Sequence, residues 1–155
     1  MVALFCDAWG QPTDLRLGEP SEATPGPGEI AVQAHAAALN FADTLMIAGK
    51  YQVKPPFPFT PGFEAAGEVT AVGEGVSGFA VGDRVFCALQ NGGLSSRIVA
   101  PAKRVFPIPD SMDFQTAAAW PVIYGTSHIA LVHRGHLQAG ETLLVLGATS
   151  GVGLA

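Results

Sequence analysis

The sequence predicts a mainly β fold with some α structure: a small, strongly bent barrel, then helices and the first βα unit of a doubly wound α/β domain. Before residue 110, short apolar runs alternate with Gly- and Pro-rich turns, which is typical of small barrels. Beyond it, helical patterns lead into TLLVLG, a continuous apolar run over residues 142–147 that suits a strand covered on both faces. We therefore expect two parts, residues 1–120 and residues 121–155.

The elements are placed by the alternation of apolar and polar residues, which predicts strands, and by residues that cap helices. A short helix is expected after Asn40, which is a good N-cap residue. Asp110 or Ser111 is expected to cap the next helix, and a second helix over residues 122–134 is expected to end at Gly135. The expected strands span residues 1–6, 14–19, 30–39, 65–73, 83–89, 95–101 and 104–109.

Composition and charge exclude several classes of partner. Only 14% of the 155 residues are charged, and the net charge is −5, whereas a nucleic-acid site needs clustered cations. No apolar run approaches the roughly 20 residues of a membrane span, and the N-terminus lacks the basic region of a signal peptide. We expect a cytoplasmic protein with no nucleic-acid or membrane partner. Cys6 and Cys87 are expected to be core thiols, and His133 and His136 solvated turn residues.

The expected last strand runs into a glycine-rich turn, GATSGVG. Gly147 would end the strand, and Gly151 and Gly153 would open a helix. The usual phosphate-binding fingerprint is G-x-G-x-x-G, whereas Ala148 and Ser150 stand here at its first two glycine positions. Two interpretations stay open: a site whose backbone N–H groups bind a pyrophosphate, and a tight βα turn without a ligand.

Five stretches of the sequence occur in a characteristic order: PGPGEIAV, LNFADTLMIAGKY, TPGFEAAGEVTAVGEGVSGFAVGDRV, AAAWPVIYGTSHIAL and LQAGETLLVLGATSGVG. Together they resemble the zinc-independent quinone oxidoreductases of the medium-chain dehydrogenase/reductase superfamily. The resemblance implies a GroES-like barrel joined by bridging helices to a Rossmann domain, with NADPH in the cleft between them. It also implies hydride transfer from NADPH to a quinone or another conjugated carbonyl.

Members of this family are considerably longer, so we expect an N-terminal fragment that is inactive alone. The residue that separates NADP from NAD follows the fingerprint by about 20 positions, so NADP is expected here from the resemblance alone. No catalytic metal is expected either. Zinc-dependent members of the superfamily place a Cys, a His–Glu pair and a further Cys at the positions of Asn40, Phe63–Glu64 and about Val122. A catalytic zinc needs three protein ligands, and Asn and Phe remove two of them.

Asn40 and Tyr51 are the candidate catalytic residues. Asn40 resembles the family asparagine beside the nicotinamide end of the cofactor, and it also suits a helix N-cap. Tyr51 resembles the tyrosine of the substrate pocket, where its O–H would donate to a quinone oxygen; the alternative is a loop aromatic that covers the barrel. Thr126 resembles a threonine that contacts the nicotinamide, or else its hydroxyl bonds its own helix. The candidate cofactor-binding residues are Asn40, Thr126, Gly147, Ser150, Gly151, Val152 and Gly153.

Two acidic residues are interpreted as structural. Asp43 lies three residues after Asn40, where it completes a capping interaction. Glu64 lies in the apolar stretch FEAAG, where a carboxylate needs a partner or its pKa rises. We expect a buried pair of Glu64 with Arg84, and a general acid is the alternative.

Two other hypotheses for the function remain. The acceptor would be an enoyl thioester or another enone, or the barrel would be a catalytically silent binding or assembly module. The single Rossmann strand also suggests association with another chain, because one strand cannot form a sheet and its backbone edges stay unpaired. Residues 142–147 are therefore expected to pair with another chain in a homo-oligomer, to pack on the barrel or to be poorly ordered.

Overall fold

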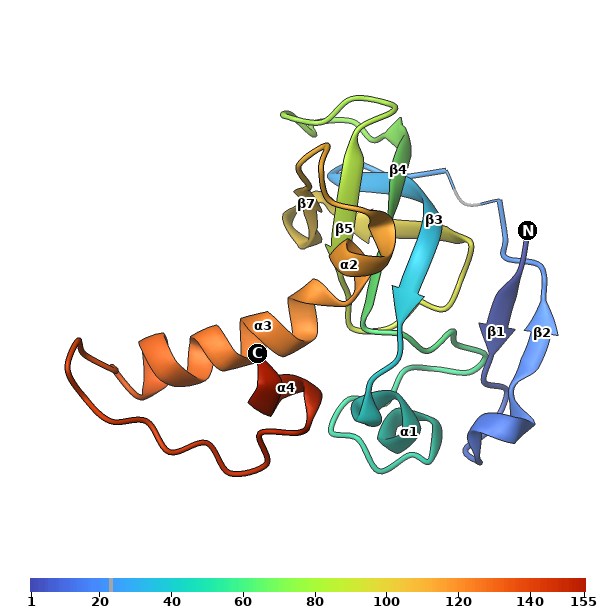
Figure 1. The fold of residues 1–155 in the computed structure, drawn as a ribbon. Coiled ribbons are helices and arrows are strands. Elements are labelled where there is room, and N and C mark those ends of the chain that lie inside the picture. Colours follow the sequence, from blue (N-terminus) through green and yellow to red (C-terminus); the bar gives the residue numbers. More distant parts are fainter. Residues whose placement is uncertain (23) are drawn as a thin grey trace.

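Seven strands form two antiparallel sheets in the computed structural model, which describes residues 1–22 and 24–155 (Figure 1). In the small sheet, β1 (Ala3–Phe5) pairs with β2 (Arg16–Gly18), and the 3-10 turn η1 (Pro12–Asp14) lies between them. The larger sheet has the order β6–β3–β4–β5–β7, with β3 (Glu29–Ala38), β4 (Glu64–Val72), β5 (Arg84–Ala88), β6 (Arg97–Pro101) and β7 (Val105–Pro107). Each strand overlaps one expected from the sequence, so the prediction of a mainly β fold is confirmed.

The larger sheet is rolled, because its two edge strands are nearly continuous in the chain. Only the 3-10 turn η2 (Ala102–Arg104) separates β6 from β7. Three residues span at most about 10 Å, so the two edges come close together, as in a small barrel. Alternate side chains of β3, β5 and β6 point inward and form the core, with Ile30, Val32, Val85, Cys87, Ile98 and Ala100 among them.

The sheet bends where β3 and β4 lose their regular register. One irregularity lies between Ala34 and Ala36, opposite Gly67. A Cβ atom on Gly67 would fall on the carbonyl oxygen of Gln33, so the two strands can approach each other at this bend only because the residue is glycine. His35 is the extra residue of the bulge, and its ring stacks on Phe114 with centroids 4.6 Å apart.

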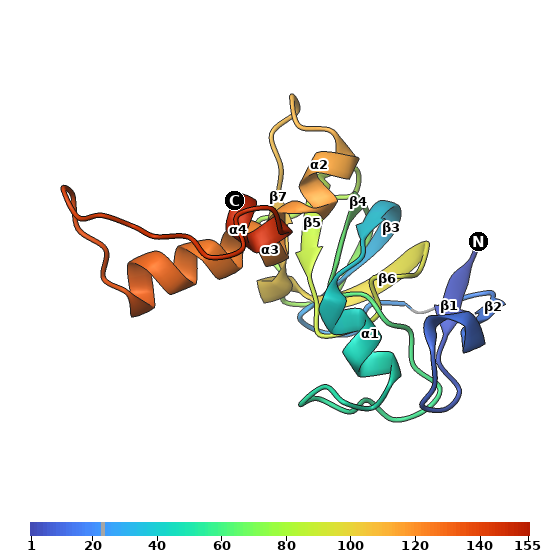
Figure 2. The ribbon, with the colours of Figure 1, turned by 60° about the horizontal axis from the view of Figure 1, so that its bottom comes forward.

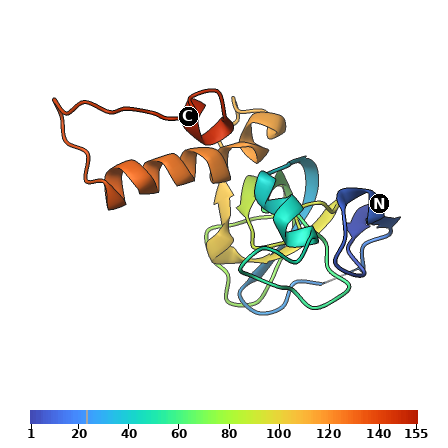
Figure 3. The ribbon, with the colours of Figure 1, turned by 90° about the horizontal axis from the view of Figure 1, so that it is seen from below.

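Of the two short helices, α2 (Phe114–Ala118) packs on the larger sheet, and α1 (Phe41–Ile47) lies beyond the end of β3 (Figure 1). Helix α1 follows β3 directly and lies over one end of the sheet (Figure 3). Helix α2 is capped by Asp113, whose carboxylate accepts the N–H of Thr116 at 2.7 Å. The expected cap at Asp110 or Ser111 was therefore wrong. The chain makes a further turn before the helix, and the side chain of Arg84 binds three carbonyl oxygens of that turn.

The helical segment after α2 extends away from the sheet (Figures 1 and 2). Helix α3 (Trp120–His128) continues directly into a π-helical segment, Ile129–Arg134, whose C-cap is Gly135. This confirms the second expected helix, which begins two residues earlier than expected because Pro121 is accommodated in its first turn. Among the residues that the structure describes, no helix is long and apolar enough to cross a membrane.

The strand expected over residues 142–147 is not formed, so this prediction was wrong for the chain alone. The segment is extended and exposed, with Leu144 79% and Leu146 86% accessible. A strand is stable only when a neighbouring strand takes its backbone hydrogen bonds, and none of the described residues pairs with it. Helix α4 (Gly151–Leu154) then follows the glycine-rich turn.

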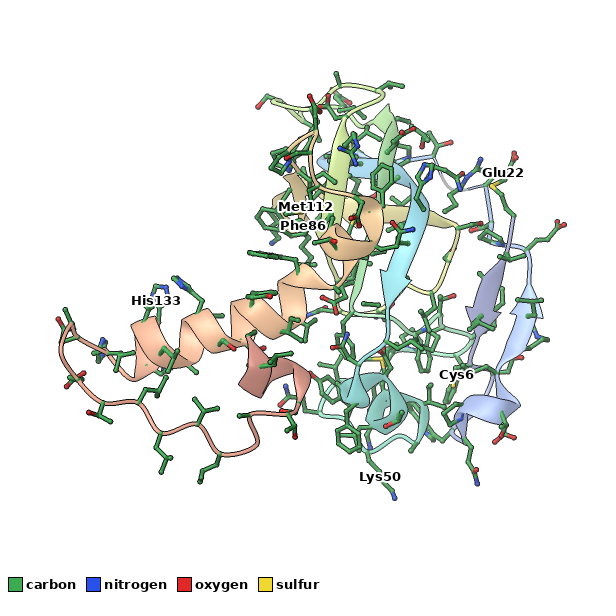
Figure 4. The ribbon with its side chains drawn as sticks, in the orientation of Figure 1. Cys6, Glu22, Lys50, Phe86, Met112 and His133 are labelled. Carbon is green, nitrogen blue, oxygen red and sulfur yellow. The ribbon has the colours of Figure 1, made fainter. Side chains whose placement is uncertain are left out.

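The cysteines and the C-terminal histidines lie in opposite environments. Cys6 and Cys87 are buried and free, which confirms that they are core thiols. Burial raises the pKa of the Cys87 thiol to about 12. His133 and His136 are exposed as expected, but His133 lies in the π-helical segment rather than in a turn and projects away from the sheet, as Lys50 does after α1 (Figure 4).

Candidate functional site

The candidate site begins where β3 passes into α1. Asn40 occupies the N-cap position of α1 with an extended backbone, as expected. Its backbone N–H donates to Asp43 Oδ2 at 2.8 Å, which confirms the expected capping role of Asp43. The other carboxylate oxygen of Asp43 accepts the N–H of Gly62 at 2.9 Å. Asp43 therefore connects the start of α1 to the turn that precedes β4.

Glu64 is the first residue of β4, and only 1% of it is accessible. Both of its carboxylate oxygens are occupied. Oε1 accepts from Nδ2 of Asn40 at 2.8 Å, and Oε2 accepts from the backbone N–H of Val122 at 2.7 Å. Val122 lies in the first turn of α3, where backbone N–H groups have no partner within the helix. Glu64 thus joins the beginnings of α1, β4 and α3.

The expected pair between Glu64 and Arg84 was wrong. In the β4–β5 ladder Arg84 lies opposite Glu68, whereas Glu64 lies opposite Ala88. Four residues along a strand correspond to about 13 Å, which puts the Arg84 side chain at the other end of the ladder. Its guanidinium donates to the carbonyl oxygens of Pro109, Asp110 and Met112 and lies 4.6 Å from the centre of the Phe114 ring.

Burial dominates the electrostatics of the two carboxylates. It raises the pKa of both Asp43 and Glu64, because water solvates the charged form better than the protein interior does. The hydrogen bonds from Asn40 and from the Gly62 and Val122 amides act in the opposite direction, since they stabilise the charged form. The negative charge of Asp43 raises the pKa of Glu64 further.

Tyr51 is connected to this cluster through an aromatic contact. Its half-buried ring packs edge-on against Phe63, the residue before Glu64, with centroids 5.3 Å apart. Tyr51 also borders the small core formed by Cys6, Met46, Ile47 and Phe59. This packing is what the interpretation as a loop aromatic requires. The role of the Tyr51 hydroxyl at a substrate pocket stays a prediction.

The glycine-rich turn is held by its own residues. Gly147 has a positive φ of 84°, which is unfavourable for residues with a Cβ. The Ser150 hydroxyl donates to the Gly147 carbonyl at 2.9 Å and accepts the Gly153 N–H at 3.4 Å, so Ser150 caps α4. A Cβ on Gly153 would fall on the Gly147 carbonyl oxygen. The turn therefore needs glycine at positions 147 and 153 even without a ligand.

This turn packs against α3 beside Thr126. The Ser127 hydroxyl donates to the carbonyl of Val152 at 2.9 Å. A Cβ on Gly151 would lie 3.1 Å from the Ile123 side chain, so these two segments are in close contact. Thr126 is exposed and lies one helical turn after Val122. Helix α3 thus joins the turn and Thr126 at one side to the Asn40–Glu64 pair at its start.

Three anchors of the site were not predicted from the sequence. The N–H groups of Val122 and Gly62 are backbone donors, which carry no signal in the side-chain pattern, and Ser127 stands among other small polar residues. The one signal available was Glu64 itself, a carboxylate in an apolar stretch that had to find donors. In the described part of the chain, no three His, Cys, Asp or Glu side chains lie close enough together to hold a metal ion.

Comparison with known proteins gives consistent matches. The profile of the family described as alcohol dehydrogenase GroES-like domain matches residues 26–110. A quinone oxidoreductase-like protein 2 homolog of Nematostella vectensis is 41% identical over 155 residues, which cover 99% of this chain and 42% of that protein. This chain spans less than half the length of the curated relatives that it matches.

Solved structures give the same picture. The human synaptic vesicle membrane protein VAT-1 homolog-like protein superposes with a TM-score of 0.94 at 34% identity, over 99% of this chain and 50% of that one. A mycobacterial protein in complex with NADPH superposes with a TM-score of 0.90 at 34% identity, over 99% and 48% of the two chains.

Proposed function

Because the chain belongs to the alcohol dehydrogenase GroES-like domain family, we propose that it forms the barrel and the start of the cofactor domain of an NADPH-dependent reductase. The reductase would transfer a hydride to a quinone or another conjugated carbonyl without a metal. The relatives named as quinone oxidoreductases and the NADPH complex of a similar protein support the substrate class and the cofactor.

One observation carries the proposal: Asn40, Glu64 and the start of α3 form a single hydrogen-bonded cluster. It ties Asn40 to the same helix that carries Thr126 and contacts the glycine-rich turn. A cofactor lying along α3 would then meet the turn at its pyrophosphate and Asn40 and Thr126 at its nicotinamide. These are the residues expected from the resemblance, and the cluster supplies a physical reason for their common orientation.

The residues present fit NADPH and do not fit a catalytic zinc. Gly147 and Gly153 make a turn in which the backbone comes close to itself, and a Cβ at position 153 would fill it. Gly151 and Val152 would then present backbone N–H groups to the phosphates, and the Ser150 hydroxyl, which bonds Gly147 and Gly153, would hold the turn in place. An amide and a phenyl ring at positions 40 and 63 lack the donors that zinc prefers. NADPH supplies the hydride when bound, and the protein supplies orientation.

Without a metal, the carbonyl of the acceptor must be polarised by hydrogen bonds. Tyr51 is the proposed donor, because its ring packs on Phe63 beside Glu64 and a phenol O–H group can donate a hydrogen bond. A donor of this kind stabilises the negative charge that develops on the acceptor oxygen as the hydride arrives. A flat conjugated acceptor would stack between this ring and the nicotinamide.

The test is a titration of NADPH, followed by nicotinamide fluorescence, against the 155-residue chain and against a longer natural form that contains these residues. Binding by the longer form alone supports the proposal that this chain is inactive by itself. Absence of binding by both forms would favour a silent binding or assembly module. Turnover of quinones and of enones, including enoyl thioesters, by the longer form then identifies the acceptor.

A further inference from the structure

We propose that Glu64 is a positioning residue, which sets the orientation of the Asn40 side-chain amide and fixes α3 relative to it. This inference rests on the proposed function, because it assigns to Asn40 the task of accepting a hydrogen bond from the nicotinamide end of the cofactor. Asn40 would touch the cofactor, whereas Glu64 acts only through Asn40 and through the first turn of α3.

The Glu64 carboxylate decides which end of the Asn40 amide faces it. An ionised carboxylate only accepts hydrogen bonds, and here one oxygen receives the Val122 N–H while the other receives Nδ2 of Asn40. The Asn40 amide can therefore bind Glu64 only with its nitrogen. Its oxygen, Oδ1, is turned away from Glu64, so the charge on a buried residue decides which end of the amide is offered elsewhere.

The main chain of Asn40 is held as well. A separate buried carboxylate, that of Asp43, accepts the Asn40 N–H at 2.8 Å and the Gly62 N–H at 2.9 Å. The backbone and the side chain of Asn40 are thus each held by a buried carboxylate from a different segment. Such support gives a binding residue a fixed position before any ligand arrives, which lowers the entropy lost on binding.

Glu64 also holds the start of α3. Glu64 accepts an N–H group in the first turn of this helix, which the helix itself leaves without a partner. Thr126 follows Val122 by one turn, so the same carboxylate determines how far Thr126 lies from Asn40. Glu64 therefore sets the relative positions of Asn40 and Thr126, the two residues proposed for the nicotinamide end, without touching the cofactor.

The substitution Glu64→Gln tests this directly, since it keeps the volume and changes the donor pattern. The new amide oxygen can still accept from Val122, but the new NH₂ group then faces Asn40. The Asn40 amide must flip so that Oδ1 accepts from this NH₂ group. Its Nδ2 then faces the cofactor, where a donor stands in place of the acceptor. We expect E64Q to weaken NADPH binding by the longer form about tenfold, the usual scale for leaving a buried hydrogen-bonding group without its partner.

The double variant N40D/E64Q exchanges the acid and the amide. The aspartate introduced at position 40 accepts from the new NH₂ with one oxygen and offers its other oxygen as the acceptor. We expect NADPH affinity to return to within about threefold of the unsubstituted protein, since the pair and the acceptor are both restored. If Glu64 were only structural, adding N40D would not restore the NADPH affinity. Glu68→Gln is the matched control, because Glu68 lies exposed on the same strand.

Each outcome decides the matter. NADPH binding unchanged in E64Q, or lowered equally in E64Q and N40D/E64Q, overturns the positioning role while leaving the proposed function intact. Absence of NADPH binding by every unsubstituted form overturns the proposed function and, with it, this inference.

One measurement needs no variant and so does not depend on E64Q folding. In the ¹⁵N-labelled 155-residue chain, the side-chain NH₂ of Asn40 and the N–H of Val122 should shift with a common midpoint as Glu64 titrates, with the Asp43 titration followed separately at Gly62. Independent midpoints for the Asn40 and Val122 signals would also overturn the positioning role.

Discussion

Asp43 and Glu64 are buried carboxylates, and each is stabilised by the hydrogen-bond donors around it. Asp43 is 3% accessible and Glu64 is 1% accessible, yet both carboxylates receive two hydrogen bonds. Local spacing sufficed to predict that Asp43 caps α1, because a capping interaction joins residues three apart. The partners of Glu64 lie 24 and 58 positions away in the chain, so local spacing could not identify them.

The raised pKa of Asp43 gives a test at the residue scale. Between the ordinary Asp pKa of about 3.9 and the raised pKa of folded Asp43, the native state holds more protons than the unfolded state. The contribution of Asp43 to the free energy of unfolding therefore falls as pH rises. The free energy of unfolding of the unsubstituted chain minus that of D43N should therefore decrease from acid toward neutral pH, as measured by urea unfolding.

Asp113 provides a control of opposite sign. The hydrogen bonds from Thr116 hold the pKa of Asp113 below the ordinary value. Its contribution to the free energy of unfolding is therefore present above the unfolded pKa and is lost as pH falls. The corresponding difference for D113N should increase with pH. A D43N difference that is flat, or that rises as the D113N difference does, would contradict the prediction.

At the scale of elements, close backbone approach explains which glycines the fold requires. Gly67 lies in β4 at the bulge of β3, where a Cβ would meet the Gln33 carbonyl. Gly78 lies in the β4–β5 connection with a φ of 81°, and a Cβ atom added there would have no other atom within 4 Å. The first position is restricted by space, and the second only by backbone conformation.

The substitutions Gly67→Ala and Gly78→Ala separate these two causes. We expect G67A to lower the free energy of unfolding by about 3 kcal/mol or more, because the strand pair must move apart. G78A should cost about 1 kcal/mol, which is the scale of left-handed backbone strain. Urea unfolding of both variants measures the difference, and equal losses in the two would contradict the account of the bend.

At the scale of the whole molecule, the rolled sheet encloses a core, whereas no strand among the described residues pairs with residues 142–147. The exposed side chains of residues 143–146 form a continuous apolar stretch with a free backbone edge. Such edges pair with other chains. The expectation that this segment mediates strand pairing or homo-oligomer formation therefore stays a prediction, and the structure adds the exposure that would drive it.

The double substitution L144E/L146E tests the prediction. The unsubstituted 155-residue chain should self-associate as its concentration rises, and L144E/L146E should shift the equilibrium strongly toward monomer, because each change places a charge on the pairing surface. Sedimentation velocity measures this shift. The control L17E/V81E alters two similarly exposed side chains elsewhere. A chain that stays monomeric throughout, or a control with the same effect, would contradict the prediction.

The family resemblance, which the matching family profile and the quinone oxidoreductase relatives confirm, came from motifs spread along the chain. The sequence by itself determined the strands, the turns, the N-cap at Asn40 and the two core cysteines, because alternation, glycine conformation and capping act over a few residues. Only the tertiary structure decided that Glu64 meets Asn40 and Val122 rather than Arg84, because sheet register and the path of α3 set those distances. It also decided that residues 142–147 form no strand, since a strand exists only when another segment takes its hydrogen bonds.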